Sequence, residues 1–106
     1  MAGRRVAVDA AGHLLDPAGW DAGLARAMAA ADGIELSPAH WQVIDFLRDW
    51  HGRHGKSPPM RVLVRELALS LGAERAESRV LYRLFPQGPA KQAARYAGLP
   101  RPTSCI

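Results

Sequence analysis

A chain of 106 residues, 48% of them hydrophobic and 23% charged, has the size and composition of one globular domain with a single core. No apolar run approaches the roughly 20 residues of a membrane-spanning helix, and Asp9, His13 and Asp16 interrupt the apolar stretch that a signal peptide needs after its basic start. The net charge of +4 indicates acidic or anionic partners, and we expect a single-domain cytoplasmic protein that makes no use of a membrane.

A hairpin and about five helices are predicted, in chain order, from alternating valines near the start and from helix-period apolar positions that follow. Proline or a capping residue opens most of the helices, and glycine or proline ends them. The predicted elements are a β-hairpin over residues 4–15 and helices over residues 16–31, 37–54, 59–71, 74–85 and 89–97.

The second helix has the clearest start signal, because the capping residue Ser37 is followed by Pro38 in the first helical position. Its apolar stripe is wide enough to contact neighbours on more than one side. We therefore expect this helix at the centre of a mainly α fold. The predicted fold is an orthogonal bundle of about five helices with an N-terminal β-hairpin and an extended C-terminal arm.

The predicted arm covers residues 99–106 and follows a helical body of residues 1–98. Leu99 and Arg101 each precede a proline, which disfavours helical geometry, and Pro100 and Pro102 have a fixed φ. The arm is therefore predicted to be semi-rigid. Eight residues at about 3.3 Å each reach on the order of 25 Å, enough to bring a side chain into a partner's cleft.

Cys105 lies on this arm. Because it is the only cysteine, the chain cannot form an internal disulfide framework or a cysteine-based metal cage. A lone cysteine is commonly an inert buried residue, but its place after two prolines predicts an exposed thiol. Only the thiolate is a good nucleophile. We expect Lys91, Arg95 and Arg101 to stabilise it and to steer the arm, and the carboxylate of Ile106 to oppose its ionisation.

The charge distribution supports a binding role for this end of the chain. From Ser78 onward there are five basic residues and no acidic one. This asymmetry favours an acidic protein partner, an anionic substrate or a nucleic acid, although a solvated basic face has the same pattern.

Other candidate sites are weaker. His51 and His54 are three residues apart without an evident third ligand, so no metal site is expected, and no motif for another cofactor stands out. Arg61 and Arg65 lie on one face of a predicted helix where they would meet phosphates if the bundle were a helix-turn-helix. Nucleic acid binding stays a possible but not a favoured function.

Several segments match the sequence pattern of one known protein family. The resemblance is densest toward the end of the chain, where the family pattern matches residues 81–86, 88–93, 97–103 and Cys105. Residues 40–41, 44–48 and 59–61 look like the middle of the family, and Trp20 in its Asp-rich context fits the start. The pattern is that of the DsrC/TusE family of sulfur-carrier proteins, which this chain closely resembles over nearly its whole length.

The resemblance implies a helical bundle with an N-terminal hairpin and a mobile C-terminal arm, in which Cys105 receives sulfur as a persulfide and passes it on. It places Ala94 where members of the DsrC type have a second cysteine, and Ser104 where the family usually has glycine. Without a second thiol, an internal disulfide and the trisulfide chemistry of dissimilatory sulfite reductase are not available. The pattern that remains is that of TusE.

The favoured function is therefore a sulfurtransferase that relays persulfide sulfur through Cys105. The implied partners are a sulfur-donor complex of the TusBCD or DsrEFH kind and a downstream acceptor, as in 2-thiouridine synthesis on tRNA. Two alternatives stay open: a DsrC-like partner of dissimilatory sulfite reductase or of another sulfur-oxidation complex, and a DNA-binding regulatory homologue.

Overall fold

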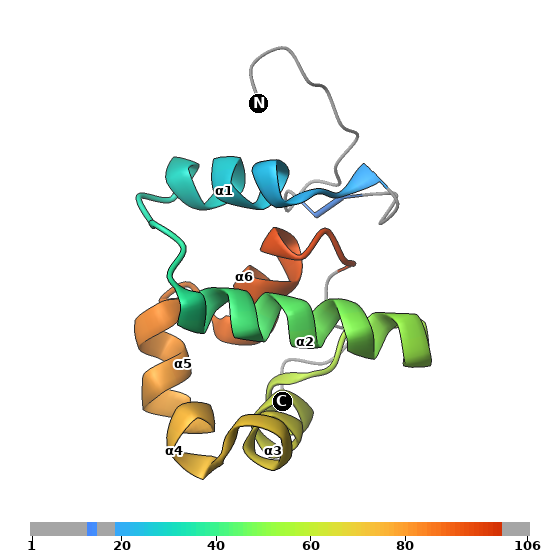
Figure 1. Ribbon diagram of the computed structural model, residues 1–106, viewed down its shortest axis with the longest axis vertical. Helices are drawn as coiled ribbons and strands as arrows, with labels where there is room; N and C mark the ends of the chain where they lie inside the picture. The colour runs from blue at the N-terminus through green and yellow to red at the C-terminus, as the bar shows by residue number, and fades with distance from the viewer. Residues whose placement is uncertain (1–12, 15–18, 101–106) are drawn as a thin grey trace.

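The computed structural model describes residues 13–14 and 19–100, and these are mainly α-helical, as predicted (Figure 1). The hairpin predicted over residues 4–15 falls outside the described residues except for His13 and Leu14, and no β-hairpin is present among those that are described. The helices are α1 (Ala22–Ala31), α2 (Pro38–His54), α3 (Met60–Leu71), α4 (Ala73–Ala76), α5 (Ser78–Leu84) and α6 (Pro89–Tyr96).

The ends of α1 and α2 follow from local chemistry. Asp21 caps α1, where its carboxylate accepts a hydrogen bond from the backbone N–H of Leu24 at 2.8 Å, so the helix begins later than the predicted residue 16. Ser37 caps α2 as predicted, in a capping box in which His40 stands at the position usual for Glu or Gln. The Nδ1 atom of His40 accepts from the Ser37 N–H at 3.0 Å, and its Nε2–H donates to the Leu84 carbonyl at 2.8 Å.

The helix predicted over residues 74–85 is wrong as a single element, because the chain breaks at Glu77 with φ −60° and ψ 140°. Ala76 and Leu81 are both buried in the core. In one continuous helix two residues five apart lie about 140° from each other around the axis, so no single face would bury both. The break between α4 and α5 lets each of them reach the core.

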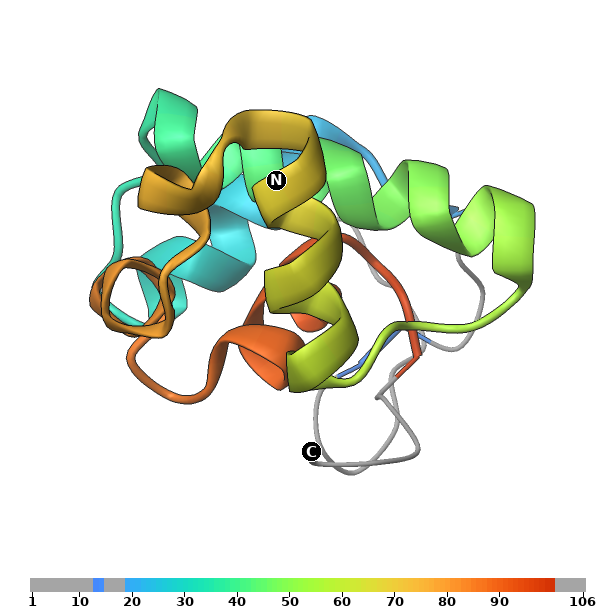
Figure 2. The ribbon, with the colours of Figure 1, turned by 90° about the horizontal axis from the view of Figure 1, so that it is seen from below.

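The centre of the fold is α6 and not α2. This helix contacts α1, α2, α3 and α5. Figure 1 shows it between α1 and α2, and Figure 2 shows it beside α3. Six of its eight residues are buried, among them Ala90, Ala93 and Ala94. Small side chains allow close approach of the surrounding helices, so the last helix of the chain holds the bundle together.

α6 ends in a Schellman motif, which sets how the chain leaves the core. Gly98 has φ 72°, its N–H donates to the Arg95 carbonyl at 3.1 Å, and the Leu99 N–H donates to the Ala94 carbonyl at 3.0 Å. Leu99, which the sequence pattern assigned to the arm, is 1% exposed and belongs to the core. The Trp20 ring packs directly on Gly98, where a Cβ atom would lie 2.5 Å from Cδ1 of Trp20.

We predict that Gly98→Ala destabilises the fold more than Gly33→Ala. Both glycines have a positive φ, of 72° and 76°, and substitution of either costs roughly 1–2 kcal/mol for the left-handed backbone. Nothing lies within 4 Å of a Cβ at Gly33, whereas at Gly98 the clash with Trp20 adds about 1–3 kcal/mol. Denaturant unfolding measures both variants, and equal losses would contradict the packing of Trp20 on Gly98.

Candidate functional site: the root of the C-terminal arm

The segment that leads to Cys105 is held by side chains from distant parts of the chain. We call Tyr96–Pro100 the arm root. Four of its carbonyl oxygens accept hydrogen bonds from side chains of the body. The donors are Trp20 Nε1 to Tyr96 at 2.6 Å, Arg48 Nη1 to Ala97 at 2.7 Å, His13 Nδ1 to Leu99 at 3.0 Å and Ser57 Oγ to Pro100 at 2.6 Å.

Trp20 and Arg48 form the inner part of this arrangement. The Arg48 guanidinium lies 4.2 Å from the centroid of the Trp20 ring, in a cation–π contact, while it donates to Ala97. Burial lowers the pKa of the Arg48 side chain from its ordinary value, although an arginine stays protonated at neutral pH. The buried end of α6 therefore has its carbonyl groups paired with a fixed indole and a fixed cation.

Ala94 lies inside the bundle. Its side chain is 0% exposed, and it packs in the core cluster with Ala93 and Ala97. At the position where the resemblance implies a second cysteine in DsrC-type members, this chain has a methyl group in a hydrophobic environment. Residue 94 therefore has no thiol with which Cys105 could form a disulfide.

Arg95 is engaged within the body. Its guanidinium forms an ion pair with Asp32, the C-cap residue of α1, and the two side chains are only 22% and 15% exposed. The Tyr96 hydroxyl also donates to Asp32, at 2.6 Å, and accepts from Gln92 Nε2 at 2.8 Å. The geometry therefore directs the charge of Arg95 to the α1–α6 contact.

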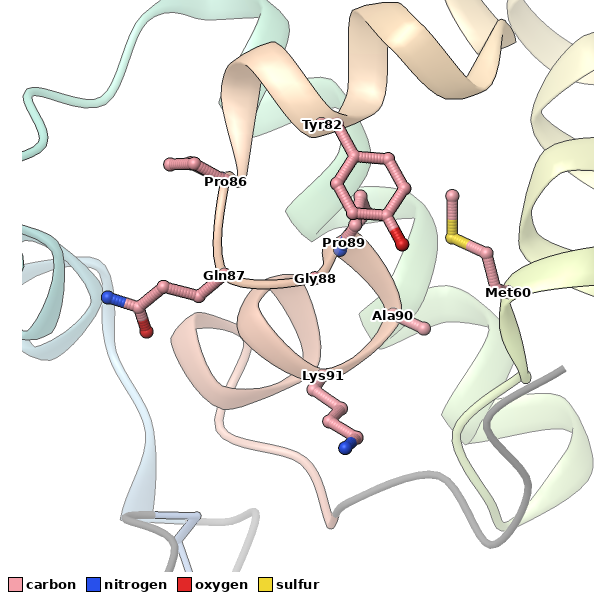
Figure 3. A pocket seen from close by; sticks show the side chains of 8 residues that line it. All are labelled: Met60, Tyr82, Pro86, Gln87, Gly88, Pro89, Ala90 and Lys91. Atoms are coloured by element: carbon pink, nitrogen blue, oxygen red, sulfur yellow. The ribbon is translucent and has the colours of Figure 1, made fainter.

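Lys91 is exposed, in contrast to Arg95 one turn later on the same helix. It borders an open hollow of about 280 Å³ between the start of α3, the end of α5 and the start of α6. Figure 3 shows Tyr82 and Met60 facing this hollow and Lys91 extending from the first turn of α6 below them. A basic residue in a first turn opposes the helix dipole, so helix stability does not account for Lys91.

Cys105 and Arg101 lie outside the described residues. Of the four predicted site residues, the structure thus places Lys91 and Arg95, on one helix but in different surroundings. Ser57 donates a hydrogen bond to the carbonyl of Pro100, which is the residue of the arm root closest in sequence to Cys105.

The other sequence-level candidates are also located. His54 stacks on Trp50, with ring centroids 4.0 Å apart, and the part of the chain that the structure describes contains no group of three metal-ligating side chains. Arg61 and Arg65 are exposed on α3, and Arg65 pairs with the adjacent Glu66 at 3.3 Å. None of the described helices has the length and apolarity needed to cross a bilayer.

Sequence reasoning missed Ser57, and it used Trp20 and Arg48 only as parts of the family pattern. Trp20 and Arg48 lie 76 and 49 residues from their carbonyl partners, and Ser57 lies 43 residues away. The sequence contains no signal for Ser57, because a serine directly before two prolines in a polar loop is expected to be exposed, whereas the structure shows it 4% exposed.

The fold and the site together define a class: a small helical protein that fixes the base of a C-terminal segment bearing the only cysteine of the chain. The family model described as "DsrC like protein" matches residues 1–106, and the chain belongs to this family. The resemblance inferred from the residues is thereby confirmed.

The similar proteins are of two kinds. The chain is 46% identical over 104 residues to Sulfurtransferase TusE of Pectobacterium atrosepticum and of Escherichia coli K12, covering 98% of this chain and 95% of each relative. Among solved structures, the NMR structure of Allochromatium vinosum DsrC is 44% identical with a TM-score of 0.89, over 100% of this chain and 95% of that one. The oxidized gamma-subunit of dissimilatory sulfite reductase (DsrC) from Archaeoglobus fulgidus is 39% identical with a TM-score of 0.83, over 99% and 96%.

We predict that Arg95→Met destabilises the fold and that Arg53→Met does not. Removing Arg95 leaves the carboxylate of Asp32 largely buried without its cation, and loss of one partner of such a pair costs about 3 kcal/mol. Arg53 pairs with Asp49 in an exposed contact on α2, at 58% and 67% exposure, and its loss is expected to stay within about 0.5 kcal/mol. Urea unfolding of both variants tests this, and similar midpoints would contradict a structural role for Arg95.

Proposed function

We propose that this chain is a sulfurtransferase that carries sulfur as a persulfide on Cys105. The observation that supports this most strongly is the near full-length match to TusE sulfurtransferases, in a chain whose single cysteine is Cys105. Among residues 13–14 and 19–100, which the structure describes, no other nucleophilic site of comparable form is present. The contribution of the body is to hold the arm root in place while the thiol meets one partner and then another.

The transfer step is a thiol–persulfide exchange. The Cys105 thiolate attacks the outer sulfur of a donor persulfide, a new S–S bond forms to Cys105, and the bond to the donor cysteine breaks. The sulfur atom of the donor cysteine leaves as a thiolate, which takes up a proton from solvent. Cys105 now carries the outer sulfur as a persulfide. No net oxidation occurs, because the outer sulfur moves without a change in the number of electrons. Delivery repeats the exchange with Cys105 as the donor: an acceptor thiolate attacks the outer sulfur, and Cys105 leaves as a thiolate.

Ala94 favours a one-thiol mechanism. An internal disulfide needs two cysteines whose Cα atoms approach within about 7 Å, and this chain has one cysteine. Sulfur on Cys105 is therefore removed only by an external acceptor. We propose as donor a complex of the TusBCD or DsrEFH kind, and as acceptor a tRNA-thiolating enzyme.

A second candidate is a role as partner of a dissimilatory sulfite reductase. It is favoured by the likeness to the Archaeoglobus fulgidus gamma-subunit, at 39% identity and a TM-score of 0.83. Against it stands the single cysteine, since the two-thiol chemistry implied for the DsrC type has no second thiol here. Co-purification with a sulfite reductase from the native cells, in place of a tRNA-thiolating enzyme, would favour this alternative.

We predict that the wild-type protein gains one sulfur atom when it is incubated with glutathione persulfide, and that Cys105→Ser gains none. The gain is read by intact mass under non-reducing conditions and is reversed by a thiol reductant. Ser104→Ala serves as the control, because it changes the adjacent residue and keeps the thiol. Absence of sulfur on the wild-type protein, or sulfur retained in Cys105→Ser, would refute the proposed carrier.

We predict a separate steering role for Lys91. Its exposed ammonium group beside the hollow is expected to attract an acidic partner surface, so Lys91→Glu should slow transfer from the protein donor by roughly three- to tenfold at low salt. The rate with glutathione persulfide should not change. Arg53→Glu makes the same charge change at the far end of α2 and is the matched control. An equal slowing in both variants would show that only net charge matters.

A further inference from the structure

Ser57 lies in the short connection between α2 and α3, and its hydroxyl binds the arm root. Gly55 ends α2 in a left-handed conformation, and Pro59 precedes α3. Pro58 is fully buried, and Ser57 itself is 4% exposed. Two consecutive prolines fix the backbone φ on the C-terminal side of Ser57, so the hydroxyl sits on a stiff support. It donates to the Pro100 carbonyl over 2.6 Å.

This hydrogen bond contributes little to the stability of the folded body. Pro100 is exposed, in contrast to the buried Leu99 before it. Water is near an exposed residue and can replace a lost hydrogen-bond partner, so this partly buried contact contributes little to the stability of the body. The bond therefore has a geometric consequence that is larger than its contribution to stability.

The consequence concerns the backbone at residue 100. The ring of Pro100 fixes φ, and a hydrogen bond to its carbonyl fixes the orientation of the next peptide plane, which is set by ψ. For a proline, ψ has two main allowed regions, one extended and one helical. The Ser57 hydroxyl selects one of them. The His13 contact with the Leu99 carbonyl holds the peptide plane before Pro100, and the Ser57 contact with the Pro100 carbonyl holds the plane after it. With φ of Pro100 fixed by the ring and ψ by Ser57, the direction in which the backbone leaves residue 100 is set.

We propose that Ser57 is a positioning residue for sulfur transfer, which aims the Cys105-bearing segment toward the donor protein by holding the Pro100 carbonyl. The inference rests on the proposed function of Cys105 and adds the part of the body that directs it. Cys105 follows Pro100 by five positions, so a thiol reaches at most about 17 Å from this anchor, and the direction of departure decides which cleft it meets.

The first test measures sulfur transfer with two donors. Ser57→Ala removes the hydroxyl at minimal change in volume, and Ser70→Ala, on the exposed face of α3, is the matched control. A net hydrogen bond of this kind changes a conformational ratio by roughly twofold to tenfold, so transfer from a TusBCD-type protein donor should slow by that factor in Ser57→Ala only. Glutathione persulfide, which needs no aimed arm, should react at the wild-type rate with all variants.

The second test is independent of sulfur chemistry. Because Cys105 is the only cysteine, a methanethiosulfonate nitroxide labels that position alone. The spin-label spectrum should show faster, less restricted motion in Ser57→Ala than in the wild type or in Ser70→Ala. Ser57→Thr keeps the hydroxyl and should restore both the spectrum and the transfer rate.

The outcomes separate the two proposals. Identical spin-label spectra and identical protein-donor rates in wild type and Ser57→Ala would overturn the positioning role, as would an effect that threonine fails to restore. A wild-type protein that accepts no sulfur from either donor would refute the carrier function, while the spin-label comparison would still decide whether Ser57 aims the arm. An equal slowing with both donors would assign the effect to the thiol itself and would also overturn the proposal.

Discussion

The buried C-terminus of α6 is the constraint on which the rest of the structure depends. A helix leaves its last carbonyl groups without partners inside the helix, and burial of an unpaired one costs roughly 1–3 kcal/mol. Most helices end at the surface, where water meets this need. α6 lies in the middle of the bundle, so its end must be satisfied by protein groups. The Schellman bonds do so for Ala94 and Arg95, and Trp20 and Arg48 do so for Tyr96 and Ala97.

Satisfying these carbonyls also fixes the bundle and the arm root together. Trp20 precedes α1 and Arg48 belongs to α2, so pairing both with the end of α6 sets three elements relative to one another. The ion pair of Arg95 with Asp32 adds a second connection between α1 and α6. The basic residues of α6 thereby have different tasks. Arg95 contributes to stability within the body, and Lys91, which opposes its own helix dipole, is left to face solvent.

Local chemistry was predictable from the sequence, and long-range contacts were not. Ser37-Pro38, Gly55 and Gly98 act on their immediate neighbours, so the bounds of α2 and the end of α6 followed from residue type. The central place of α6 was not predicted, because alanines give a weak apolar signal although they allow the closest packing. The break at Glu77 was not predicted, because it follows from the burial of both Ala76 and Leu81 in the core. Arg48 and Ser57 bind carbonyl groups more than 40 residues away, and no local pattern encodes such a partner. The thiol and its single occurrence were evident at once, since they depend only on composition.

A carrier with one thiol depends more on the geometry of its arm than a carrier with two. With two thiols, an internal disulfide forms only when the arm is folded back, so the chemistry itself sets one position of the arm. This chain has a buried methyl group at residue 94 and no internal partner for Cys105. The position of its thiol must therefore come from the body and from the partner protein. A rigid root limits the orientations that the thiol samples before an encounter, which lowers the entropy lost on reaching the donor sulfur. On the proposal that Cys105 carries sulfur, a single thiol and a tightly held arm root are thus consistent parts of one mechanism.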